Sequence, residues 1–143
     1  MKELFDVHCH MVPGVDDGAA DLEESLEMLK MQHEDGVRKI IITPHYRRRM
    51  FETPAKKVHE QFLKLQEAAK KEYPDIKIVM ARGNCDYTSI GADVELCEAE
   101  GYKIGVTHGH LYGVNWDTFG LEKLAFENKL SLVIYGHTHC RVC

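Results

Sequence analysis

The sequence predicts an α/β fold: one domain with a mostly parallel sheet of about five βα units. Its 143 residues are enough to bury a substantial core, and 44% hydrophobic with 29% charged residues is typical of a globular protein. Short apolar runs alternate with amphipathic segments, as strands alternate with helices in βα units. Continuous runs rich in β-branched residues favour strands that are buried on both faces of a parallel sheet.

Five apolar runs are the predicted strands. In order they are ELFDV (3–7), VRKIIIT (37–43), IKIVMA (76–81), YKIGVT (102–107) and LSLVIY (130–135). Each is short, as buried strands are, and is followed by turn residues or by a histidine.

The segment between the first two strands is predicted to be a helix. Leu22, Leu26 and Leu29 keep helical spacing. Asp21 is placed to cap the helix with Glu24 three residues on, and a glycine at position 36 is placed to end it.

A second helix is predicted between the second and third strands. Thr53 is the expected N-cap, Pro54 occupies the first helical position and Pro74 follows the end. The apolar face consists of Val58, Phe62, Leu65 and Ala69. We expect one more helix over 117–128, and one short helix after a loop within 88–100.

Charge, hydropathy and cysteine usage exclude several classes of function. A net charge of −5 argues against a general nucleic-acid surface. The first residues have no apolar stretch fit for a signal peptide, and no run approaches membrane-spanning length. Five scattered cysteines argue against a disulfide framework, so we expect a reducing, cytoplasmic location without membrane association. The oligomeric state is not indicated.

Histidines gather at one kind of position. Of nine, only His33 and His59 fall on predicted helices. The other seven follow the carboxyl ends of predicted strands, where parallel sheets bind ligands: His8, His10, His45, His108, His110, His137 and His139. A lone histidine there is more often structural, but seven at one edge predict a metal centre. Cys9, between His8 and His10, is expected to face the core.

Oxygen ligands are available beside these histidines. Asp17 lies in a Gly-Val-Asp-Asp-Gly turn, where it can equally be a turn residue or a helix cap. Asn84 and Asp86 follow the third strand, and Asp86 can bridge two metals or be an ordinary turn aspartate. Mixed imidazole and oxygen ligands suit divalent manganese, zinc, iron, nickel or magnesium. We expect two or three such ions.

Basic and sulfur-containing residues leave further alternatives. The triplet Arg47–Arg49 is either a solvated surface or a clamp for a phosphate oxygen. Cys85 and Cys140 adjoin candidate ligands, but neither lies in a glycine loop that could cradle phosphate, so a cysteine nucleophile fits less well. Cys140 and Cys143 form a C-x-x-C that can alternatively bind a structural zinc with the preceding histidines.

Residues 6 to about 80 resemble the PHP (polymerase and histidinol phosphatase) superfamily. The motifs are DVHCHMVPGVDDGA, LEESLEMLKMQHEDGV, IIITPHYRRRMFETP and KVHEQFLKLQEA. They are most similar to its bacterial manganese-dependent tyrosine-phosphatase branch, which is associated with capsule and exopolysaccharide synthesis. The resemblance implies an incomplete TIM-like barrel with a trinuclear centre, in which His8 and His10 bind one metal and Asp17 and His45 bind another.

Residues from about 82 to 142 resemble the calcineurin-like metallophosphoesterases, in their small phosphodiesterase branch. The motifs are RGNCDY, KIGVTHGHLYGV and LSLVIYGHTHCRV. This resemblance implies a layered α/β fold with a dinuclear centre. Its ligands would be Asn84, His108, His137 and His139, with His110 near the substrate.

The two resemblances meet near residues 80–84, and together they predict a hydrolase of phosphoric esters that uses metal-activated water. His110, Arg47 and Arg48 are the candidates for stabilising the phosphoryl group or protonating the leaving oxygen. Two alternatives remain: a PHP-type protein-tyrosine phosphatase, and a metal-binding hybrid without catalytic activity.

Overall fold

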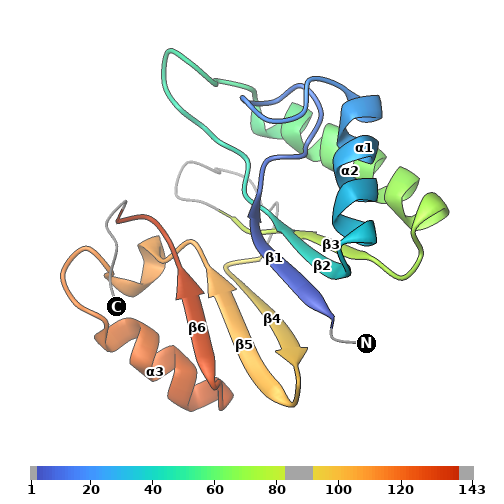
Figure 1. The fold of residues 1–143 in the computed structure, drawn as a ribbon. Coiled ribbons are helices and arrows are strands. Elements are labelled where there is room, and N and C mark those ends of the chain that lie inside the picture. The colour runs from blue at the N-terminus through green and yellow to red at the C-terminus, as the bar shows by residue number, and fades with distance from the viewer. Residues whose placement is uncertain (1–2, 83–91, 139–143) are drawn as a thin grey trace. The chain divides into compact units, whose positions relative to one another are not determined.

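The computed structural model describes residues 3–82 and 92–138. Internal contacts divide the chain into two compact units; among the described residues, the first ends at Met80 and the second begins at Ala81. Figure 1 shows the elements of each unit. The division falls where the two sequence resemblances meet. That the chain forms a single domain stays a prediction.

The first unit contains a parallel three-stranded sheet in the order β1-β2-β3. Its strands are β1 (Leu4–Cys9), β2 (Val37–Ile42) and β3 (Lys77–Met80). The helix α1 (Leu22–Glu34) connects β1 to β2, and α2 (Ala55–Glu72) connects β2 to β3 (Figure 1). The helix α1 packs against α2 and β2, while α2 packs against β3. The predicted strands and helices of this half are confirmed.

The central strand of this unit, β2, is buried on both faces. Ile40, Ile41 and Ile42 are all at most 1% exposed, although neighbouring side chains in a strand point to opposite faces. Ile40 and Ile42 belong to a core cluster with Leu29 of α1 and Leu65 of α2. A strand buried on both faces is the expected position for a continuous apolar run.

The two helices of this unit begin differently. The Asp21 carboxylate accepts a hydrogen bond from Glu24 N (2.9 Å), and the Glu24 side chain accepts one from Ala20 N (2.7 Å), so the predicted cap of α1 is confirmed. The prediction of Thr53 as the N-cap of α2 is wrong, because Pro54 occupies that position. The Thr53 hydroxyl instead donates to Val15 O (2.9 Å), tying the start of α2 to the loop after β1.

The second unit contains another three-stranded sheet, in the order β4-β5-β6. Its elements are β4 (Val94–Ala99), β5 (Tyr102–Thr107), the 3-10 helix η1 (His110–Tyr112), α3 (Phe119–Asn128) and β6 (Leu132–Tyr135). The β4–β5 pair is antiparallel and the β5–β6 pair is parallel. The α/β class with mostly parallel strands is therefore confirmed. No helix in the described part of the chain is long and apolar enough to cross a membrane.

The prediction for the segment 88–100 is wrong in the part that the structure describes, and the count of about five βα units is not confirmed. A short helix was expected there, but residues Val94–Ala99 form β4, which pairs with β5 from Val94↔Thr107 to Ala99↔Tyr102. Glu100 (φ 51°) and Gly101 (φ 80°) make the two-residue hairpin turn between them. Glutamate, leucine and alanine favour helix locally, but the hairpin satisfies the backbone groups of the segment by pairing instead.

Candidate metal site

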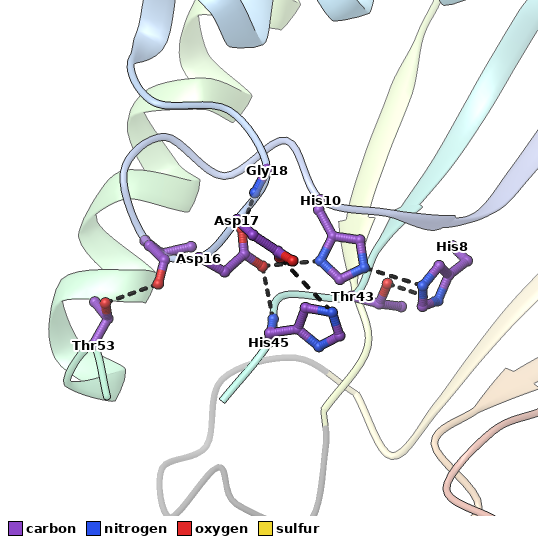
Figure 2. Close-up of polar contacts among 9 residues, drawn as sticks. His8, His10, Asp16, Asp17, Gly18, Thr43, His45 and Thr53 are labelled. Carbon is purple, nitrogen blue, oxygen red and sulfur yellow. Dashed lines mark hydrogen bonds and ion pairs between the residues drawn. The ribbon is translucent and has the colours of Figure 1, made fainter. Parts of the chain in front are cut away.

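The carboxyl ends of β1 and β2 bring the first group of histidines together. Cys9 pairs with Ile42 at the ends of the two strands, and Thr43 N donates to Cys9 O (2.9 Å). Because the strands are parallel, the residues that follow them emerge at the same edge. His8, near the end of the first strand, and His10, just after it, therefore lie beside His45, which follows the second (Figure 2).

His10, Asp17 and His45 form a group that can hold a metal ion. One ligand atom from each lies within 4.8 Å of the others. The His10 and His45 rings are 4.2 Å apart between centroids, and His45 Nε2 lies 3.8 Å from Asp17 Oδ1. Asp17 and His45 are exposed, so a ligand can reach them from solvent. Two imidazoles and one carboxylate are a donor set suited to a borderline divalent cation.

His8 lies next to this group, with its Nε2 atom facing that of His10. The two Nε2 atoms lie 3.0 Å apart, while His8 Nδ1 lies 3.0 Å from Thr43 Oγ1. Burial, followed by the neighbouring His10 and His45, lowers the pKa of His8. A lowered pKa favours the neutral imidazole, which is the form that binds metals.

Asp16 is a buried carboxylate beside this group to which the sequence analysis assigns no role. Its side chain is 0% exposed. Its Oδ2 accepts hydrogen bonds from His10 Nδ1 (2.9 Å) and His45 N (2.7 Å), and its Oδ1 accepts one from Gly18 N (3.0 Å). Burial raises the pKa of Asp16, but these hydrogen bonds together outweigh burial and lower it. The only sequence signal was the Asp-Asp pair, which does not distinguish the buried carboxylate from the exposed one.

Gly18 allows the loop after β1 to approach the backbone of His10 closely. A Cβ atom on Gly18 would collide with the backbone oxygen of His10. Ala19 N donates to that same oxygen (3.1 Å). The loop therefore folds back over His10, and the Gly18 position excludes any larger residue.

The arginines predicted as phosphate ligands lie just beyond His45. All three are exposed, and Arg47 N donates to Phe51 O (2.9 Å) in a tight turn that includes Arg49 at φ 68°. The turn places the Phe51 ring parallel to that of His45, with centroids 6.1 Å apart. The catalytic roles of Arg47 and Arg48 stay predictions.

In the second unit, three of the predicted histidines form another group. The Nδ1 atoms of His108 and His110 are 3.2 Å apart, and the His108 and His137 rings are 4.9 Å apart between centroids. Asn115 Nδ2 lies 3.0 Å from His137 Nε2. The three histidines follow β5 and β6, the predicted strand ends, while the expectation that all seven histidines share one edge stays a prediction. Metal ligation by this group, and the catalytic role of His110, stay predictions.

Several candidate residues lie outside the described part of the chain: Asn84, Cys85, Asp86, His139, Cys140 and Cys143. The structure describes Cys9, which is 6% exposed and belongs to the core as expected. Burial raises its pKa to about 11, so the thiol is protonated at neutral pH and is no nucleophile.

Comparison with known families and proteins shows the family of this chain and two kinds of curated relative. A family model described as "Capsular polysaccharide synthesis, CpsB/CapC" matches residues 4–112, continuing past Met80 into the second unit. The tyrosine-protein phosphatase CpsB of Streptococcus pneumoniae is 44% identical over 75 residues, which cover 52% of this chain and 31% of that protein. The probable metallophosphoesterase YsnB of Bacillus subtilis is 35% identical over 60 residues, covering 42% of this chain and 36% of that protein.

A solved structure also resembles the fold. It is that of a predicted phosphoesterase from Streptococcus pneumoniae TIGR4, with a TM-score of 0.50 and 19% identity over 96% of this chain and 61% of that chain. This likeness concerns the fold alone. Both resemblances expected from the motifs are confirmed. The chain spans about a third of the length of the curated relatives it matches.

Proposed function

The chain belongs to the CpsB/CapC family, and from this premise we propose that it is a metal-dependent hydrolase of phosphoric esters. The observation that carries the proposal is the convergence of His10, Asp17 and His45 within 4.8 Å at the ends of two parallel strands. Two neutral imidazoles and a carboxylate supply one negative charge, which leaves a divalent cation with net positive charge to attract a phosphoryl group.

Each residue has a distinct part in the proposed reaction. His10, His45 and Asp17 hold the cation, and His8 supplies a further imidazole 3.0 Å from that of His10. A divalent cation at such a site lowers the pKa of water and neutralises phosphoryl oxygens. The exposed arginines 47 and 48 follow His45 within three residues, from where a guanidinium can pair with a phosphate oxygen.

We propose two or three divalent ions, taken from manganese, zinc, iron or nickel. The first unit offers His8, His10, Asp17 and His45, more donors than one four-coordinate ion needs once water is included. Asn84, Asp86 and His139 are proposed as further ligands, and the group of His108, His110 and His137 offers three more imidazoles.

The proposed substrate is a phosphomonoester on an aromatic alcohol. The relative from Streptococcus pneumoniae is named a tyrosine-protein phosphatase, and this chain is 44% identical to it over the matched residues. The exposure of Asp17 and His45 suits a phosphate group carried on a protein chain, because the phosphate can be reached without entering a deep cavity.

The test is turnover of p-nitrophenyl phosphate by protein that has been stripped with chelator and reloaded with Mn²⁺, Zn²⁺ or Co²⁺. We expect activity only after reloading, and its loss in His10→Ala. Asp75→Asn is the matched control, because Asp75 pairs with His33 and Arg38 rather than with the metal group. Equal turnover by wild type and His10→Ala would contradict the proposal. Metal binding without turnover would instead identify a non-catalytic metal-binding protein.

A second candidate activity is hydrolysis of phosphodiesters. It is favoured by the group of His108, His110 and His137 in the second unit and by the likeness to the relative named a probable metallophosphoesterase. Turnover of bis-p-nitrophenyl phosphate tests it. If this activity is lost in His137→Ala and kept in His10→Ala, the second unit carries it.

A further inference from the structure

We propose that Asp16 is the positioning residue of the candidate metal site: it fixes the ring and tautomer of His10 and holds His45 in place before a metal binds. The inference rests on the proposed function, because it assumes that His10 and His45 are metal ligands. It assigns a role to a residue outside the group of His10, Asp17 and His45.

The geometry is that of one buried carboxylate shared by three partners. Asp16 Oδ2 lies 2.9 Å from His10 Nδ1 and 2.7 Å from His45 N, while its Oδ1 accepts a hydrogen bond from Gly18 N at 3.0 Å. The Asp16 side chain is fully buried, which limits competition from water and strengthens these bonds. Figure 2 shows Asp16 on the loop after β1, with its side chain directed toward His10 and His45.

The contact with His10 determines which ring nitrogen faces the metal. An ionised carboxylate has no proton to give, so the proton of the hydrogen bond belongs to His10 Nδ1. The lone pair of the ring is then on Nε2, which is the atom that lies 3.0 Å from His8 Nε2. A carboxylate behind a metal-binding histidine also increases the basicity of the ring as a ligand.

The contact with His45 extends this effect to a second strand. His45 is 29 residues from Asp16 in the sequence, and its backbone nitrogen donates to the same oxygen that holds His10. Asp16 Oδ2 therefore connects His10, which follows the first strand, to His45, which follows the second. The adjacent Asp17 is exposed and belongs to the metal group. Asp17 is thus the ligand, and Asp16 orients the two histidines.

The first experiment measures Mn²⁺ affinity by calorimetry in wild type, Asp16→Asn and the control Asp75→Asn, with the melting temperature of each metal-free protein recorded separately. Asparagine keeps the shape but cannot accept with both terminal groups, so either His10 or a backbone amide loses its acceptor. We expect about 10-fold to 100-fold weaker binding in Asp16→Asn, the usual cost of losing such a partner. We expect unchanged affinity in Asp75→Asn. A folded Asp16→Asn protein with wild-type affinity would overturn the proposal.

The second experiment needs no variant that might fail to fold. Long-range ¹⁵N–¹H correlation NMR of the metal-free wild type reports which nitrogen of His10 carries the proton. A protonated Nδ1 is expected, and a protonated Nε2 would overturn the role of Asp16. Failure of the proposed function is distinguishable: wild type that binds Mn²⁺ but hydrolyses no phosphate ester contradicts the activity, while these two measurements still decide the role of Asp16.

Discussion

His8 Nε2 and His10 Nε2 lie 3.0 Å apart, and the Nδ1 atom of each ring has its own partner, Thr43 for His8 and Asp16 for His10. With the Nδ1 proton of His10 directed at a carboxylate, its Nε2 is a lone pair aimed at a second imidazole. Such a nitrogen can accept a hydrogen bond from its neighbour or bind a cation. The hydrogen bond between the two rings and a bound cation therefore compete for the same lone pair of His10.

Metal removal should lower the stability of the protein. A ligand that binds only the folded state adds about 2.7 kcal/mol at a free concentration 100 times its Kd. We expect chelator to lower the melting temperature and Mn²⁺ to restore it. The restoration should be smaller in His10→Ala and unchanged in His33→Ala, since His33 lies outside the metal group and pairs with Asp75. Identical metal-dependent shifts in all three proteins would contradict this assignment.

Asp17→Asn should cost more bound metal and more activity than Asp86→Asn. Asp17 is the carboxylate of the described metal group, and its replacement by a neutral amide removes the one negative charge of that group. Metal content per chain and turnover of both ester types in the two variants measure the difference. Greater damage from Asp86→Asn would show that ligands following the third strand organise the centre instead.

Cys9 should resist alkylation although it lies between two candidate ligands. Its thiol is 6% exposed with a pKa of about 11, so the reactive thiolate is scarce at pH 8. Treatment with iodoacetamide followed by peptide mass spectrometry should show Cys97, which is half-buried, modified faster. The difference should vanish in denaturant. Equal rates in the folded protein would show that Cys9 is accessible.

The ion pair at the opposite end of the first sheet should give a pH-dependent contribution to stability. His33 Nε2 lies 3.1 Å from both oxygens of Asp75, and this contact first, with Arg38 also contributing, holds the pKa of Asp75 below its ordinary value of 3.8. A lowered carboxyl pKa stabilises the fold above the unfolded-state pKa, and this contribution is lost as the pH falls through the folded-state pKa. Asp75→Asn should therefore melt below wild type at pH 7, with a difference that shrinks below pH ~4. A difference that is constant from pH 7 to pH 3 would contradict the ionic origin.

Replacing Glu100 in the β4–β5 turn by asparagine should stabilise the protein. Glu100 has φ 51° beside Gly101 at φ 80°, the left-handed conformation that favours Asn-Gly in two-residue hairpins. The left-handed conformation costs a non-glycine residue roughly 1–2 kcal/mol of conformational free energy, and it costs asparagine less. Glu100→Asn should therefore stabilise the protein by up to about 1 kcal/mol. Urea denaturation measures this gain. Glu98→Asn in the adjoining strand is the control, and it should show no gain.

The sequence by itself predicted five of the six described strands, the three described α-helices and the residues of the candidate metal group in the first unit. Its apolar runs are continuous, so strands such as Val37–Ile42 follow from local composition. His10 and His45 were identifiable because residues that follow parallel strands share one edge of the sheet, whatever their separation in the chain, whereas Asp17 was indicated by the PHP resemblance. The N-cap of α1 was equally local, since its partners lie within four residues.

Tertiary structure decided what depends on segments far apart in the chain. Residues Val94–Ala99 became a strand because β5 supplies their hydrogen-bond partners, against their local preference. The Thr53 hydroxyl donates to Val15 O, 38 residues away in the sequence, instead of capping α2. Asp16 and Asp17 are neighbours of the same type, yet one is buried under His10 and the other is exposed beside His45. Burial and hydrogen bonding fix the role of a carboxylate, and both are set by the atoms that packing brings around it rather than by its place in the chain.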